Sequence, residues 1–381
     1  MPANTQDRLM HIVQARQAVL YGERPQGSTA TGLDHWIERS WQRCLASGHR
    51  PEHAPSFDMI SAPALRRTLD DNHLLVQAAR PVLEKLGRAI ADTRYFAILT
   101  NQHGVVVDVN GDIDRSDPRA SLITRIGTDL SERSIATTAI GAALTELQPV
   151  WLHRGEHFFE ANAVYSCAGA PLFGPDGACV GMLDLTGIEA AERPELKHLV
   201  AQSARSIENA LTLGRFEKPG GLLIRLNWPG RALGDETDGL VCLDADGYLL
   251  GANQAARQML PQLGYPAGPR LHCSDLFAMA FEMLFDAARH QGSPAGALEV
   301  PLWTGLRLHA LPLLTGPGNL PAPLRLSSTP ASAPQPLKDI ETALIRKAVD
   351  DARGNVLKAA KALGVSRATV YRRLGAAVKR R

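Results

Sequence analysis

The segment GNVLKAAKALGVSRATVYRRL, residues 354–374, decides how the C-terminal part of this chain is organised. Before it, apolar residues at helical spacing from Leu337 onward predict a first helix that stops at Gly354, a residue suited to the turn past a helix end. Asn355 can cap a short second helix that ends at Gly364, and Ser366 can cap a third helix over 367–374. Small residues inside the second helix allow a close, steep crossing, so the pattern predicts a helix-turn-helix.

Charge separates this segment from the rest of the chain. Residues 338–381 hold 12 Lys and Arg against 4 Asp and Glu, a net charge of +8, whereas the preceding residues sum to −6 and the whole chain to +2. Clustered cations favour nucleic acid because neutralising phosphates releases condensed counterions. A solvated basic tail is the alternative on charge alone, and the helical pattern disfavours it.

In a helix-turn-helix, the first residues of the second helix of the motif meet base edges, while flanking cations hold phosphates. We therefore expect two groups of DNA contacts. The base-facing residues are Ser366, Arg367, Ala368 and Thr369, and the backbone-facing residues are Tyr371, Arg372 and Arg373.

The run from Gly354 to Arg372 resembles the Fis-type helix-turn-helix that ends bacterial enhancer-binding activators of sigma-54 promoters. The resemblance implies that the long first helix, 337–352, pairs with its twin in a homodimer. Such a dimer reads two half-sites about 34 Å apart on double-stranded DNA.

Length and composition predict several globular domains: 381 residues with 45% hydrophobic and 21% charged residues can build more than one core. The chain has neither an apolar run near 18 residues nor an export signal, so we expect a cytoplasmic protein without membrane contact. The 5 cysteines include no CxxC pair, which predicts free thiols and no zinc site.

The expected fold is multidomain α+β: a GAF-like α/β sensor, a small PAS-like α+β domain and an all-α C-terminal helix-turn-helix. The boundaries that we expect are 1–60 for an N-terminal helical segment, 61–215 for the sensor, 236–313 for the PAS-like domain, 314–336 for a Pro-rich linker and 337–381 for the DNA-binding domain.

Upstream, residues 33–47 place Trp36, Ile37, Trp41 and Cys44 on one face of an amphipathic helix. A second helical pattern over 64–93 predicts either a dimer stalk or a core helix.

Further helices are expected over 135–147 and 195–213. Strands are expected at 95–99, 105–109, 149–153, 168–172 and 178–185, with turns at 101–104 and 174–177. Antiparallel strands with helices gathered on one side predict an α+β sensor module.

Residues 36–44 and 127–187 resemble the entry segment and the GAF domain of acetoin-catabolism-type regulators, through stretches such as Gly181-Met182-Leu183-Asp184-Leu185. Where relatives read Gly-Thr-Asn before Ala-Ile-Gly, this chain has Ala136-Thr137-Thr138. If that loop touches an effector, its ligand differs from that of the relatives.

Aromatic side chains beside hydrogen-bonding groups are typical of a small-molecule cavity. The effector-binding candidates are Trp151, His153, His157, Phe159, Tyr165 and Cys167. Each one taken singly also fits a plain core or rim role. His153 and His157 have metal-ligand spacing only on a helix, and their neighbours indicate strand and loop, so we expect no metal and no cofactor.

Residues 238–244, 248–251 and 253–256 indicate strand, strand and helix, and 306–313 a closing strand. The pattern resembles the start of a PAS domain, a fold that binds haem, flavin or nothing. We expect an empty, dimerising domain here.

No Gly-Lys pair occurs in the chain, so the phosphate loop of an ATPase, GxxxxGK[ST], is missing. The leading hypothesis is a sequence-specific transcription regulator, not an enzyme, that answers to a small effector, contacts RNA polymerase and lacks the sigma-54 ATPase. The alternative is a thiol redox sensor or a methionine sulfoxide reductase-like enzyme acting through Cys167 or Cys179.

Overall fold

The structure, a computed structural model, describes residues 5–22, 33–214, 220–264, 270–289, 298–314 and Val356. The chain divides into two compact units, residues 1–320 and residues 321–381. The expected linker and helix-turn-helix therefore lie outside the described residues, apart from Leu314 and Val356.

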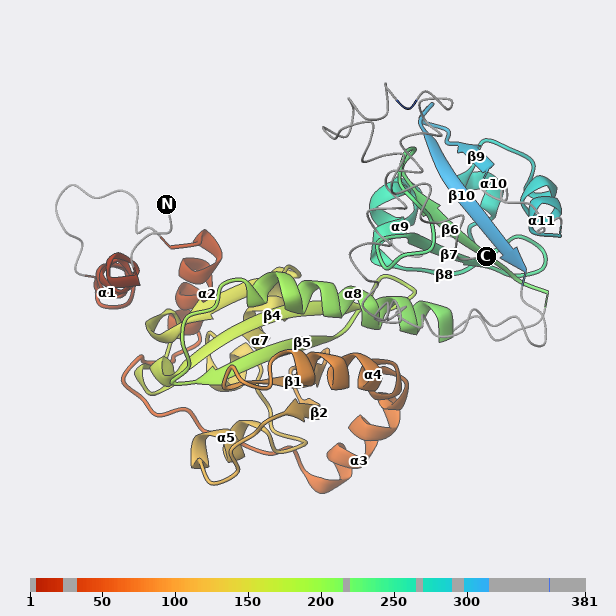
Figure 1. Ribbon diagram of the computed structural model, residues 1–381. Helices are drawn as coiled ribbons and strands as arrows, with labels where there is room; N and C mark the ends of the chain where they lie inside the picture. Colours follow the sequence, from red (N-terminus) through yellow and green to blue (C-terminus); the bar gives the residue numbers. More distant parts are fainter. Residues whose placement is uncertain are drawn as a thin grey trace. The chain divides into compact units, whose positions relative to one another are not determined.

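Two five-stranded antiparallel sheets organise the first unit (Figure 1). The first sheet has the strand order β2-β1-β5-β4-β3. Its members are β1 (Tyr95–Asn101), β2 (Val106–Gly111), β3 (Val150–His153), β4 (Tyr165–Phe173) and β5 (Cys179–Ile188). The two hairpins and the strand at 149–153 that the sequence predicted are confirmed, and so is the mixed α/β fold.

Both faces of this sheet are covered, and β1 shows why its sequence has no polar face. All seven residues of β1 are buried. Successive side chains of a strand point to opposite faces, so Ala97 and Leu99 join one apolar cluster while Phe96 and Ile98 join the other. A strand buried on both faces therefore shows a continuous apolar run.

Helices α4 (His73–Ala89) and α8 (Leu196–Gly214) cover the first face. The single helix predicted over 64–93 is wrong, because the chain forms α3 (Ala62–Asp71) and then α4. Asn72 lies at the break: its side-chain amide donates at 2.8 Å to the carbonyl of Thr68, which also accepts the backbone N–H of Asn72 at 3.1 Å. Of the two, α4 is a core helix, whereas α3 buries none of its residues.

The second face is covered by α1 (Thr5–Leu20), α2 (His35–Ala46), α5 (Pro118–Ile123), α6 (Glu132–Ile135) and α7 (Ala139–Glu146). The short turns η1 (Arg154–Glu156) and η2 (Glu160–Val164) complete it. The predicted α2 is confirmed with its buried face of Trp36, Ile37, Trp41 and Cys44. The helix expected over 135–147 begins only at Ala139, because Ala136 interrupts it with a positive φ.

The second sheet has the order β8-β7-β6-β10-β9. Its strands are β6 (Leu222–Asn227), β7 (Gly239–Leu243), β8 (Leu249–Ala252), β9 (Leu298–Pro301) and β10 (Arg307–Leu314). On one face pack α9 (Gln254–Met259), η3 (Pro261–Gly264), α10 (Cys273–Leu276) and α11 (Phe281–Arg289). The expected strands and the helix after Asn253 are present. The central strand β6 was missed, and it precedes the expected domain start at 236.

Helix α8 also contributes to the second sheet. Leu213 at its end packs against a small cluster of Leu223, Leu240 and Cys242 on the face away from α9. The side-chain amide of Asn253 donates to the side-chain oxygen of Asn209 in α8 at 2.7 Å, and both side chains are buried. One helix therefore belongs to the cores of both sheets.

Candidate ligand cavity

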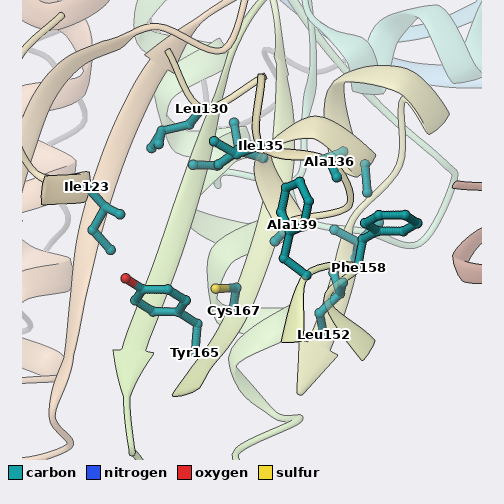
Figure 2. Packing of buried hydrophobic residues seen from close by; sticks show 14 of the residues in the cluster. Ile123, Leu130, Ile135, Ala136, Ala139, Leu152, Phe158, Tyr165 and Cys167 are labelled. Carbon is teal, nitrogen blue, oxygen red and sulfur yellow. The ribbon is translucent and has the colours of Figure 1, made fainter. Parts of the chain in front are cut away.

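A cavity of about 30 Å³ lies between the first sheet and the helices of its second face. Its walls come from β1, β4, β5, the segment 123–140 and the loop residues Phe57, His157 and Asn162. Figure 2 shows the Tyr165 ring and the Cys167 thiol of β4 on one side, with Ile123, Leu130 and Ile135 across from them. Most lining residues are apolar, so the few polar groups decide what the cavity can bind.

His157 supplies one of these polar groups. Its side chain is buried, and Nδ1 lies 2.9 Å from the carbonyl oxygen of Arg154. A carbonyl can only accept, so Nδ1 carries the hydrogen. Burial lowers the pKa of His157 to about 4. At neutral pH its Nε2 is therefore a buried acceptor, and it has no partner.

Asp184 supplies the second. Its side chain is wholly buried, and the Thr186 hydroxyl donates to its Oδ2, while Oδ1 has no partner. The Cys167 Sγ lies 3.4 Å from the Thr186 hydroxyl oxygen and donates to it, because that hydroxyl donates its one hydrogen to Asp184. Burial raises the pKa of Asp184 to about 7. The carboxyl group thus lies near its titration point at neutral pH.

The loop before α7 forms another wall and is strained. Ala136 has φ 54° and ψ −151°, a region that is essentially restricted to glycine. Thr138 follows, lines the cavity and caps α7, since its hydroxyl accepts from the backbone N–H of Gly141 at 3.2 Å. Of the three residues Ala136, Thr137 and Thr138, Thr138 is the one that lines the cavity.

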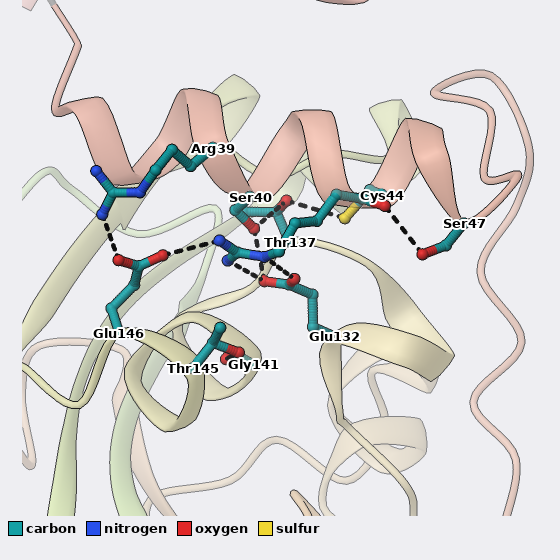
Figure 3. Close-up of polar contacts among 10 residues, drawn as sticks. Arg39, Ser40, Cys44, Ser47, Glu132, Thr137, Gly141, Thr145 and Glu146 are labelled. Atoms are coloured by element: carbon teal, nitrogen blue, oxygen red, sulfur yellow. Dashed lines mark hydrogen bonds and ion pairs between the residues drawn. The ribbon is translucent and has the colours of Figure 1, made fainter.

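Helix α2 fixes α6 and α7 from outside through charged contacts (Figure 3). Arg43 donates to both carboxylate oxygens of Glu132, at 2.7 and 3.0 Å, and to Glu146 at 2.9 Å. Partial burial acts to raise the pKa of Glu146, but hydrogen bonds from Arg39 and Arg43 outweigh it and the pKa is lowered. Ser40 joins the network by donating to Glu132 at 2.7 Å.

Helix α1 holds the wall segment 154–159. Arg16 donates to the carbonyl oxygens of Gly155 at 2.9 Å, His157 at 2.7 Å and Phe158 at 3.0 Å. Arg8 donates to both oxygens of the buried Glu156, at 2.7 and 2.8 Å. Burial raises the pKa of Glu156, and the charge of Arg8 opposes that rise.

The six effector-binding candidates divide into two groups. His157, Tyr165 and Cys167 line the cavity. Trp151 belongs to the apolar cluster on the other face of the sheet, and the ring of His153 stacks on it with its Nδ1 2.7 Å from Ser166. Phe159 is buried on the cavity face of the sheet, against His49 and Phe158, and does not line the cavity. Among the described residues no three His, Cys, Asp or Glu are grouped as metal ligands.

Sequence reasoning missed Asp184 and Thr186 as cavity residues, whereas Thr138 belongs to the loop that it considered for effector contact. A single carboxylate inside an apolar strand, as in Met182-Leu183-Asp184-Leu185, was the signal that could have identified the first. The DNA-binding candidates Ser366, Arg367, Ala368, Thr369, Tyr371, Arg372 and Arg373 lie outside the described residues.

Two family models match the chain: the MimR N-terminal domain over residues 28–209, and the bacterial regulatory protein, Fis family, over residues 336–376. Both regions agree with the curated relatives below. The chain is a homologue of the acetoin-type and MimR-type transcriptional activators.

The acetoin catabolism regulatory protein of Cupriavidus necator is 30% identical over 73% of this chain and 42% of its own length. The MimR propane 2-monooxygenase operon activator of Mycolicibacterium goodii is 28% identical over 49% of this chain and 31% of its own length. The chain thus spans less than half the length of these relatives. Among solved structures, the E. coli DhaR(N)–DhaL complex matches 74% of this chain and 100% of its own chain at 14% identity, with a TM-score of 0.45.

None of the helices in the described residues is both long and apolar enough to span a bilayer.

Proposed function

We propose that this chain is a DNA-binding transcription regulator whose first sheet module binds a small-molecule effector. The observation that carries the proposal is the Fis-family match over residues 336–376, which overlaps the segment 338–381 of net charge +8. Homology to regulators of acetoin and propane operons supports it. The chain acts as a homodimer on double-stranded DNA, and RNA polymerase is its further partner.

Ser366, Arg367, Ala368 and Thr369 read bases, while Tyr371, Arg372 and Arg373 hold the backbone. Fluorescence anisotropy with genomic fragments upstream of the neighbouring operons tests this assignment. Binding should weaken steeply as salt rises from about 50 to about 200 mM, because each neutralised phosphate releases counterions. An affinity that does not change with salt would contradict DNA recognition by this basic segment.

The effector occupies the cavity lined by His157, Asp184 and Cys167. The unpartnered acceptor on His157 and the unpartnered oxygen of Asp184 support a small, largely apolar compound that carries a hydroxyl group, since an unpaired buried polar atom costs about 1–3 kcal/mol. The ligand hydroxyl would donate its hydrogen to one of these two acceptors and so remove that cost.

A thermal-shift panel of three- to six-carbon alcohols, diols and hydroxyketones, each paired with an analogue that lacks the hydroxyl, tests the effector class. A ligand at 100 times its Kd adds about 2.7 kcal/mol to the free energy of unfolding. The stabilisation should be confined to hydroxyl compounds and should disappear in His157→Phe. If the analogues without a hydroxyl stabilise equally, the proposed polar recognition is wrong.

We also propose that this 381-residue chain does not hydrolyse ATP, because it has no Gly-Lys pair to build a phosphate loop. It acts at promoters without a motor of its own and performs no catalysis. Phosphate released from ATP by the purified chain, in excess of that in a blank without protein, would contradict this. The thiol-enzyme alternative gains no support, since burial raises the pKa of both Cys167 and Cys179.

A further inference from the structure

The cavity is too small for an organic ligand in the described conformation. Its volume of about 30 Å³ is far below the roughly 150 Å³ of an engineered apolar cavity that binds benzene. A compound of several heavy atoms enters only if a wall moves. This requirement makes the most weakly held wall the route of entry.

The wall segment 154–159 has no strand partners and contains only the short turn η1. Buried carbonyl groups need donors, and here three of them receive theirs from one side chain, Arg16 of α1. The segment also carries His157, whose ring faces the cavity. Trp41 of α2 also donates to the carbonyl of Glu156 at 2.9 Å, and the Phe158 N–H donates to the carbonyl of Thr137 at 3.3 Å, so α1 supplies three of the external hydrogen bonds of this segment but not all of them.

Glu156 adds a second dependence on α1. Its side chain is 2% exposed, and its cationic partner is Arg8, one further attachment point of the helix. The same Arg8 reaches Glu192 at 2.9 Å. A buried carboxylate whose partner is removed is strongly disfavoured, so release of α1 would drive residues 154–159 toward solvent.

The residues that attach α1 repeat every four positions, as one face of a helix requires. Arg8, Ile12 and Arg16 lie on this face, and a side chain added at Gly155 would meet Ile12 at 3.0 Å. The outer face instead exposes Leu9, Met10 and Val13 by 39%, 54% and 55%. The buried apolar residues of α1 are Ile12, Ala15 and Leu20, and the hydrogen bonds of Arg8 and Arg16 add to this attachment.

We propose that α1 is a strap that closes the ligand cavity by holding residues 154–159, and that its release opens the cavity. The strap goes beyond the proposed function, and its test needs neither DNA nor an effector. Failure of DNA binding would leave it standing, and failure of the strap would leave DNA binding untouched.

The probe is methyl methanethiosulfonate, and the measured quantity is the rate at which Cys167 becomes methylthiolated. Cys167 is buried and lines the cavity, so it reacts only when the cavity opens. Peptide mass spectrometry reads each cysteine separately. Cys242 in the second sheet reports opening elsewhere. Arg16→Ala should raise the methylthiolation rate of Cys167 by about tenfold or more and leave the rate of Cys242 unchanged.

Leu83→Ala is the matched control, since Leu83 is buried in α4 on the other face of the sheet. The two variants are compared at urea concentrations that equalise their free energies of unfolding. Arg16→Lys keeps the charge but cannot reach three carbonyls, so an intermediate rate is expected. Arg8→Ala provides the same test if Arg16→Ala does not fold. An unchanged Cys167 rate, or an equal rise in Leu83→Ala, would overturn the strap.

Discussion

Replacing Ala136 by glycine isolates the strain stored in the cavity loop. Ala136 is wholly buried and holds φ 54° and ψ −151°, a conformation that costs a non-glycine residue about 1–3 kcal/mol. Ala136→Gly removes that cost. It also loses a buried methyl, about 0.8 kcal/mol, and frees the unfolded chain, about 0.4–1 kcal/mol.

The net effect of Ala136→Gly on the free energy of unfolding therefore lies between a loss of about 1 kcal/mol and a gain of about 2 kcal/mol. Ala143→Gly is the matched control, because Ala143 is equally buried but helical in α7. It loses the same methyl and about 1 kcal/mol of helix propensity without relief of strain. We expect it to be less stable than the wild type by about 2 kcal/mol.

Urea unfolding followed by tryptophan fluorescence measures both variants, since Trp36, Trp41 and Trp151 lie in the first sheet module. The difference between the two free energies is the strain itself, about 1–3 kcal/mol. If Ala136→Gly is destabilised as much as Ala143→Gly, the loop stores no strain and the reasoning fails.

Other changes have equally direct readouts. Arg367→Ala should lose about 1–3 kcal/mol of sequence discrimination in anisotropy titrations, whereas Arg373→Ala should weaken all DNA alike; equal loss in both refutes the assignment. Because the folded-state pKa of Asp184, about 7, exceeds its ordinary 3.8, Asp184 destabilises the fold progressively from about pH 4 to pH 7. Asp184→Asn should therefore gain stability relative to wild type at pH 8 but not at pH 4, as judged by urea midpoints; a pH-independent difference contradicts this. Gly141→Ala should cost at least about 1–3 kcal/mol, because its Cβ would lie 2.7 Å from the backbone nitrogen of Glu132; an unchanged melting temperature would exclude that clash.

The sequence predicted elements whose pattern is local. The hairpin of β4 and β5 follows from a turn at 174–177 between apolar runs, and α2 follows from one clear amphipathic stripe. The break at Asn72 was missed because the helical pattern of apolar residues runs through it without interruption. The strand β6 was missed; one of its partners, β7, is the next strand along the chain, and the other, β10, lies far beyond it.

The cavity could be predicted only in part, and the strand β3 shows the reason. Trp151 and His153 are two residues apart in β3, so their side chains point to the same face of the sheet, as strand geometry predicts. Which face holds the cavity depends on the helices that pack on each face. His157 reaches the cavity because its segment is held by Arg16, more than 100 residues away in the chain. Contacts of that range leave no trace in local periodicity.

Because α8 packs in both cores, the stabilities of the two sheets are coupled. Its Val200 and Ile207 back the first sheet, while Leu213 and Asn209 serve the second. Unfolding of either sheet therefore removes part of the packing of the other, so the unfolding of one sheet should extend to the other and not stop at a domain boundary. Calorimetry of the chain should record a single heat-absorption peak for both sheets, and damage in either one would shift that common peak.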